Sequence, residues 1–182
     1  MIFTETRLKG AFIVDPELKS DDRGFFFRTW CRQEFNAHGL DVRLAQCSGV
    51  FNKKKGTLRG MHWQAAPRAE AKLIRVISGG VYDVIADLRP QSATYLQWVS
   101  LELNSDNRRM LFVPTGFAHG YLTLTDDTEL FYQMSEIYSP ECARGFRWND
   151  PAFAIDWPGE ALAISERDLK FPDFMANERH LA

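Results

Sequence analysis

The sequence contains no run of about 18 apolar residues, the length that a helix needs to cross a membrane. Its first ten residues, MIFTETRLKG, include an acidic residue and lack the apolar core of a secretory signal peptide. The formal net charge is only −2, so the chain as a whole has no electrostatic attraction for nucleic acid or anionic membranes. We therefore expect no nucleic-acid or membrane partner, and any positive potential should be confined to a site.

Cysteine is scarce, and low-complexity tracts, internal repeats and linkers are missing. The three cysteines, Cys31, Cys47 and Cys142, are far apart and form no CxxC pair. This pattern excludes a disulfide framework and predicts free thiols in a reducing cytoplasm. The uniform composition over 182 residues predicts a single domain covering residues 1–182.

Aromatic residues, in contrast, are abundant: 14 Phe, 5 Trp and 5 Tyr suit a large β-core or a base-stacking pocket. Short strand-like runs alternate with turn signals such as Gly79-Gly80. The expected strands cover residues 6–15, 44–51, 57–63, 71–78, 81–87, 96–103, 109–113, 120–124 and 129–134. This pattern predicts an all-β fold, and we expect a double-sheet jelly-roll barrel.

Three segments lie outside this regular pattern. Residues 31–40 predict a short helix that stops at Gly39, and the chain from residue 140 predicts loops with a final short helix or tail. In DDRGFFFRTW, residues 21–30, three successive phenylalanines cannot all face one side of a strand. We expect one face of this segment to enter the core and the other to cover a pocket or a partner subunit.

Two motifs within the expected barrel carry chemically active residues. Residues 56–79 and the segment PTGFAH, residues 114–119, reproduce the glycine, histidine and proline spacing of the two metal-binding motifs of cupin barrels. However, Gln64 stands where the second histidine ligand would be, and Lys72 stands where the acidic ligand would be. Because a cation in that position repels a divalent metal, we expect no bound metal.

The residues that remain in the first motif suit proton transfer. Histidine is the usual general base, which points to His62, and Lys72 could stabilise an enolate oxygen by its charge. Arg59 could grip a phosphate or sugar oxygen with two parallel hydrogen bonds. Arg59 and His62 are three residues apart, so both enter one pocket only if a bulge or turn interrupts the strand at Gly60. Considered singly, His62 could equally be a hydrogen-bonded core histidine, and Arg59 and Lys72 could equally be solvated cations.

The chain resembles the dTDP-4-dehydrorhamnose 3,5-epimerase family through motifs that run in order from residue 21 to 168. They are DDRGFF, NKKKGTLRGMHWQ, AKLIRV, GGVYDVIADLR, PTGFAHG, LFYQMSEIYSP, RWNDPAFAIDWP and SERD. The resemblance implies a jelly roll without metal or cofactor, and a homodimer whose subunits exchange N-terminal strands. It also implies epimerisation at C3 and/or C5 of a nucleoside-diphosphate-4-keto-6-deoxyhexose, above all dTDP-4-keto-6-deoxyglucose, through an enolate in deoxysugar biosynthesis.

The resemblance further assigns roles to single residues. His62 matches the general base, Asp168 the carboxylate that pairs with it, and Tyr132 the acid on the opposite face of the sugar. Lys72 matches the residue that stabilises the enolate. The implied substrate-binding residues are Arg23, Arg28, Gln46, Ser48, Arg59, His119 and Tyr138, the last of which stacks on the nucleotide base.

Three positions depart from the family pattern: Arg28, Ser48 and Ala143 replace the usual Glu, Asn and Glu. These departures leave the nucleotide, the sugar and the choice between single and double inversion open. Three alternatives remain: a nucleotide-sugar 3,4-ketoisomerase, a non-catalytic sugar-binding or structural cupin, and a metal-dependent cupin oxygenase. Tyr132 favours epimerisation over ketoisomerisation, because a tyrosine acid is not typical of barrel ketoisomerases.

Overall fold

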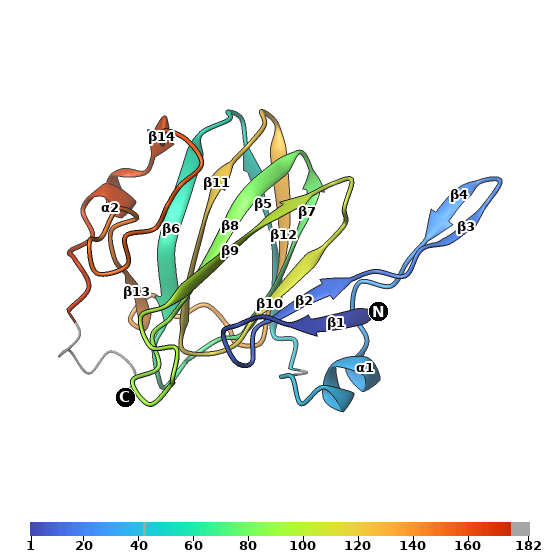
Figure 1. Cartoon of the computed structure of the whole chain (residues 1–182), viewed down its shortest axis with the longest axis horizontal. Coiled ribbons are helices and arrows are strands. Elements are labelled where there is room, and N and C mark those ends of the chain that lie inside the picture. Colours follow the sequence, from blue (N-terminus) through green and yellow to red (C-terminus); the bar gives the residue numbers. More distant parts are fainter. Residues whose placement is uncertain (42, 176–182) are drawn as a thin grey trace.

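The computed structural model describes residues 1–41 and 43–175 and contains two six-stranded β-sheets that enclose a barrel (Figure 1). The first sheet consists, in spatial order, of β1 (Ile2–Glu5), β2 (Phe12–Asp15), β10 (Met110–Val113), β7 (Lys72–Ser78), β12 (Thr128–Met134) and β5 (Gln46–Asn52). The second consists of β13 (Ala143–Gly145), β6 (Thr57–Gln64), β11 (Phe117–Thr123), β8 (Gly80–Asp87) and β9 (Trp98–Asn104), with β14 (Ala163–Ile164) parallel to β6. The predicted all-β fold is confirmed.

The outward faces of the sheets are covered by the ends of the chain. Phe146, Phe153 and Phe174 pack together against the second sheet, as part of a buried cluster that includes Met61 and Trp63 of β6. On the first sheet, a separate cluster surrounds a short helix, α1 (Arg32–Ala37). Burial from both sides fixes the central strands, so side chains that point into the barrel are held on a rigid frame.

The expected strand over residues 6–15 is wrong in its first half, because a turn separates β1 from β2. The Thr6 N–H donates to Ala11 O at 2.9 Å, and the Thr6 hydroxyl oxygen accepts from Leu8 N at 3.1 Å. Gly10 has a φ of +89°, which favours glycine, and it completes the turn. The two short strands then pair with each other in antiparallel register.

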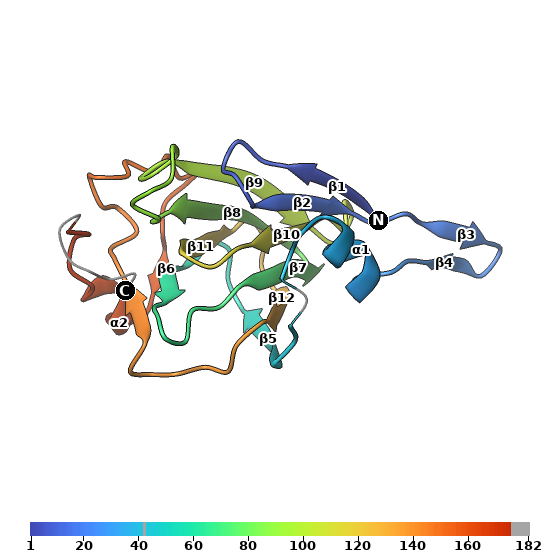
Figure 2. The ribbon, with the colours of Figure 1, turned by 90° about the horizontal axis from the view of Figure 1, so that it is seen from below.

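A second hairpin, β3 (Lys19–Asp21) and β4 (Gly24–Phe26), projects from the barrel and pairs only with itself (Figure 2). Phe25 and Phe26 are 46% and 65% exposed, and Phe27 is half-buried. The prediction that one face of this segment enters the core is therefore wrong for the hairpin, because neither sheet of the barrel lies beneath it, whereas Trp30 at the end of the segment packs against a core cluster. Exposed aromatic side chains of this kind are typical of contact surfaces.

The chain from residue 140 contains the expected loops and one short helix, α2 (Glu166–Leu169), but also the short strands β13 and β14, which were not predicted. Cys31, Cys47 and Cys142 are free thiols, as predicted, whereas the cytoplasmic location stays a prediction. Neither helix in the described part of the chain has the length and apolar character needed to span a bilayer.

Candidate active site

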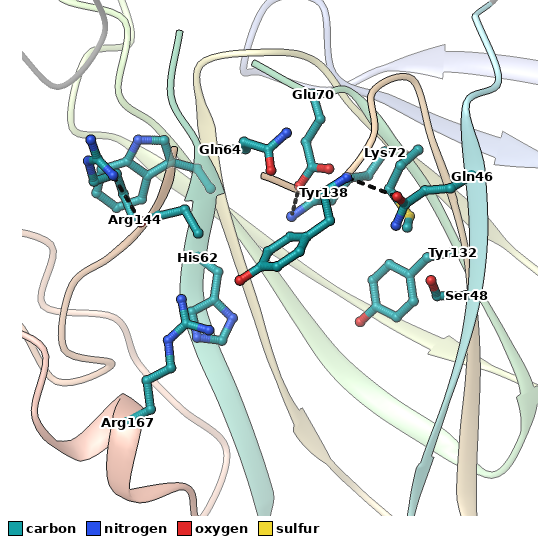
Figure 3. A pocket seen from close by; sticks show the side chains of 13 residues that line it. Gln46, Ser48, His62, Gln64, Glu70, Lys72, Tyr132, Tyr138, Arg144 and Arg167 are labelled. Carbon is teal, nitrogen blue, oxygen red and sulfur yellow. Dashed lines mark hydrogen bonds and ion pairs between the residues drawn. The ribbon is translucent and has the colours of Figure 1, made fainter. Parts of the chain in front are cut away.

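A cavity of about 440 Å³ lies between β6 of the second sheet and β5, β7 and β12 of the first (Figure 3). Its lining residues are Gln46, Ser48, His62, Trp63, Gln64, Glu70, Lys72, Tyr132, Met134, Tyr138, Ala143, Arg144 and Arg167. Six predicted site residues are among them, namely Gln46, Ser48, His62, Lys72, Tyr132 and Tyr138. The fold thus brings together residues from distant parts of the sequence.

His62 is paired with a buried carboxylate. Its Nε2 lies 2.7 Å from Asp168 Oδ1, while Gly60 N–H donates to Asp168 Oδ2 at 3.3 Å. Asp168 belongs to α2, whose N-cap, Ser165, accepts a hydrogen bond from Asp168 N. Burial alone would raise the pKa of Asp168, but the interaction with His62, together with the hydrogen bonds of Gly60 and Ser165, holds this pKa below its usual value. An ionised carboxylate therefore orients the imidazole and leaves Nδ1 to accept a proton.

The predicted interruption of β6 at Gly60 is confirmed. The register between β6 and β11 shifts between His119 and Tyr121, opposite Gly60, whose φ is +133°. A Cβ atom on Gly60 would lie 2.5 Å from the Cα of Gly120, so the two backbones approach more closely than any larger residue allows. The irregularity lets His62 reach the cavity while the Arg59 side chain reaches Asn52 of β5.

Tyr132 enters the cavity from β12, in the sheet that faces His62 (Figure 3). Burial raises the pKa of its phenol well above the usual value, and the nearby Asp83 adds to this effect. The phenol is therefore protonated at neutral pH. A protonated acid on one sheet faces a histidine base on the other.

Lys72 lies in the same cavity and forms an ion pair with Glu70. Lys72 Nζ is 3.1 Å from Glu70 Oε1, and the two side chains are 14% and 10% exposed. Sequence reasoning missed Glu70, although a spacing of two residues places both side chains on the same face of an extended segment. The carboxylate partly compensates the ammonium charge that the cavity presents.

Gln64 occupies the position of a cupin metal ligand, but its amide is engaged in structural hydrogen bonds. Its Nε2 donates to Arg68 O at 2.5 Å and to Ile137 O at 3.1 Å, and its Oε1 accepts from Ser139 N at 2.8 Å. The amide thus ties together two loops beside the cavity. Among residues 1–41 and 43–175, no three His, Cys, Asp or Glu side chains are grouped so as to hold a metal ion.

The model of the dTDP-4-dehydrorhamnose 3,5-epimerase family matches residues 5–176. The chain belongs to this family. A relative of this name from Methanothermobacter thermautotrophicus is 41% identical over 182 residues, covering 98% of this chain and 97% of the relative. The structure matches the epimerase of Bacillus anthracis, solved with TDP and PPi, with a TM-score of 0.92, 39% identity and coverage of 95% and 99%. It matches the Legionella pneumophila enzyme, solved with dTDP-4-keto-L-rhamnose, with a TM-score of 0.87, 31% identity and coverage of 96% and 98%. The predicted jelly-roll barrel is thereby confirmed.

Several residues predicted for the epimerase site lie outside this cavity in the single chain. Arg23 and Arg28 belong to the projecting hairpin and the segment after it, where they pair with Asp21 and Glu34 at 2.6 Å. Because the hairpin leaves the barrel, neither reaches the cavity of its own chain. Whether they contact substrate remains a prediction.

His119 of the epimerase is buried beside the cavity rather than in its lining. Its Nε2 lies 2.9 Å from Asp83 Oδ2, and its ring packs edge-on against Tyr132 with centroids 5.9 Å apart. Burial raises the pKa of Asp83 more than His119 lowers it. His119 is therefore placed to support Tyr132, and its predicted contact with substrate stays untested.

Two arginines that the sequence reasoning missed add positive charge to the epimerase cavity. Arg167 precedes Asp168 in α2, and Arg144 lies on β13 next to Ala143. Both arginines adjoin residues that the sequence had singled out, Asp168 and Ala143, and this adjacency was the only signal for them in the sequence. At the same cavity, Tyr138 is 49% exposed, and its N–H donates to Gln46 Oε1 at 2.9 Å. An exposed ring beside two cations suits an aromatic anion such as a nucleotide.

Proposed function

We propose that the protein epimerises C3 and/or C5 of a nucleoside-diphosphate-4-keto-6-deoxyhexose, with dTDP-4-keto-6-deoxyglucose as the leading substrate, in deoxysugar biosynthesis. The observation that supports this most is that His62 of one sheet, paired with Asp168 of α2, lies opposite the protonated Tyr132 of the other sheet. Inverting a carbon requires that a proton leaves one face and another arrives at the opposite face. A base and an acid on facing sheets provide this arrangement.

The ketone at C4 acidifies the hydrogens on C3 and C5, so the reaction can proceed through an enolate. His62 takes the proton, the electron pair of the C–H bond moves to the C4 oxygen, and Asp168 stabilises the resulting imidazolium. Lys72 stabilises the negative oxygen of the enolate. Tyr132 then donates its proton to the opposite face of the carbon, and exchange with solvent restores the neutral histidine and the phenol.

Substrate binding is the second part of the proposal. Arg144 and Arg167 supply cations for the diphosphate, and Tyr138 supplies an aromatic face for the base. Gln46, Ser48, Arg59 and His119 provide further polar groups in and beside the cavity. The relatives solved with TDP and with dTDP-4-keto-L-rhamnose support a thymidine nucleotide.

Incubation with dTDP-4-keto-6-deoxyglucose in deuterated water tests this function. We expect deuterium at C3, C5 or both, together with inversion at the labelled carbon, because each inversion delivers a solvent-derived proton. Proton NMR of the sugar reads both the label and the configuration. Labelling at one carbon only would identify a single-site epimerase. No label with the dTDP, CDP or GDP form of the sugar, or a carbonyl moved to C3, would refute the proposal.

We also propose that the protein is a homodimer in which hairpin β3–β4 places Arg23 at the partner's cavity. The hairpin projects from the barrel, its two leading phenylalanines are exposed, and the Arg23 side chain is 89% exposed. A surface of this kind needs a partner to cover it. A second copy of the chain would supply that partner and complete the set of phosphate-binding cations.

Mixing two inactive variants tests this arrangement. Arg23→Ala and His62→Asn are each expected to be impaired, but dimers refolded from both chains should regain one working site. In such a dimer the Arg23→Ala subunit keeps His62 and receives an intact Arg23 from its partner. Light scattering would report the dimer and product formation the recovery. A monomeric protein, or a mixture no more active than its components, would contradict the proposal.

A further inference from the structure

Behind Tyr132, a short chain of buried polar groups crosses the interior of the barrel from β11 to β5. The Tyr121 hydroxyl lies 3.2 Å from Asn52 Oδ1, and Arg59 Nε lies 2.9 Å from the same oxygen. The Asn52 amide is held by its Nδ2, which donates to Thr128 O at 3.1 Å. The rings of Tyr121 and Tyr132 both pack against His119, with centroids 6.1 Å and 5.9 Å from that of the imidazole, and each phenol shifts the pKa of the other. Tyr132 thus lies in the cluster of Tyr121, whose hydroxyl is bonded to a fixed amide.

Arg59 determines the direction of the hydrogen bond between Tyr121 and Asn52. An arginine can only donate, so the Asn52 atom that it contacts must be the amide oxygen. Tyr121 approaches the same oxygen and must therefore donate its single proton to it. The Tyr121 oxygen then has only lone pairs left for Tyr132. A Tyr132 phenol that bonds to Tyr121 in the resting enzyme must consequently be the donor, and therefore protonated.

Burial supports the same conclusion. Tyr121 is 1% exposed and belongs to the main core cluster, and Tyr132 packs against that cluster. Burial raises the pKa of Tyr121 to about 12 and that of Tyr132 well above its usual value. A tyrosinate formed at Tyr132 is therefore costly unless a hydrogen-bond donor turns toward it.

We propose that Tyr121 is a positioning residue that supplies this donor. When Tyr132 transfers its proton to the enolate carbon, its O–H bond breaks, a C–H bond forms and the phenol oxygen becomes negative. The Tyr121 O–H then rotates from Asn52 Oδ1 to the Tyr132 oxygen, while Arg59 still satisfies the amide. Tyr121 keeps its own proton throughout, and solvent later reprotonates Tyr132. This proposal rests on the epimerase function proposed above.

Tyr121→Phe tests the proposal, because it deletes the hydroxyl and retains the ring. The proposal predicts that inversion slows by about 10- to 100-fold, the typical effect of losing one hydrogen bond to a charged group. Removal of the proton by His62 and its return to the same face should persist. In deuterated water, dTDP-4-keto-6-deoxyglucose should therefore acquire label without inversion, and KM should change little. The ratio of inversion to exchange is measured within active molecules, so partial unfolding does not alter it.

Two further variants complete the test. Tyr82→Phe is the matched control, because Tyr82 lies on the face of β8 that points away from the barrel interior, beside Trp157. The ratio of inversion to exchange in this variant should equal that of the wild type. Asn52→Ala removes the competing acceptor and leaves the Tyr121 proton free, so its ratio should not fall below the wild-type value. An unchanged ratio in Tyr121→Phe, or a ratio lowered as much by Asn52→Ala, would overturn the proposal. Wild-type protein without exchange or inversion would instead refute the proposed function.

Discussion

Replacing His62 by Asn is expected to lower kcat by about 10²- to 10⁴-fold, the usual contribution of one general base. Both deuterium exchange and inversion should fall together, because neither begins until a proton leaves the sugar. Asn is preferred to Ala because its amide leaves a polar group beside Asp168, which is otherwise buried with a lowered pKa. Single-turnover NMR in deuterated water measures both rates.

The control for this variant is another histidine of the same chain. His38 is exposed, lies near α1 and bonds to Glu34 O at 2.8 Å, away from the cavity. His38→Asn should retain wild-type rates. Exchange that survives in His62→Asn at more than a tenth of the wild-type rate would assign the base to another residue.

The sequence predicted the barrel well because its strands are short, strongly patterned and separated by turn signals. The interruption at Gly60 was also foreseen from local geometry, as the condition for Arg59 and His62 to enter one pocket. The pairing of His62 with Asp168 could not be derived in this way. The two residues are 106 positions apart, and only the family resemblance linked them before the structure placed them 2.7 Å apart.

Contacts that cross the barrel were missed for a similar physical reason. The link from Tyr121 to Asn52 depends on how β11, β6, β5 and β12 align, and a shift of one residue in a strand reverses the direction of its side chains. The projecting hairpin was misjudged because aromatic residues predict burial without specifying the chain that buries them. Sequence patterns therefore specified the scaffold and the reactive groups, whereas strand register determined the network behind them.

Replacing Lys72 by Met is expected to slow exchange and inversion alike by about 10²- to 10³-fold, the range found when one preorganised stabilising group is removed. The enolate is common to both processes, so its stabilisation affects them equally. Methionine retains much of the length of the side chain without its charge. Lys53, an exposed residue on the turn before β6, provides the matched control, and Lys53→Met should keep the wild-type rate.

Lys72→Met also leaves the Glu70 carboxylate, which is 10% exposed, without its partner at 3.1 Å. An unpaired buried group of this kind costs about 1–3 kcal/mol, so the variant should melt at a lower temperature. Adding Glu70→Gln removes the unpaired charge and should restore most of the stability. The rate should stay low in the double variant, because no cation then faces the C4 oxygen. If the rate recovers along with the melting temperature, Lys72 acts by keeping the cavity folded and not by stabilising the enolate.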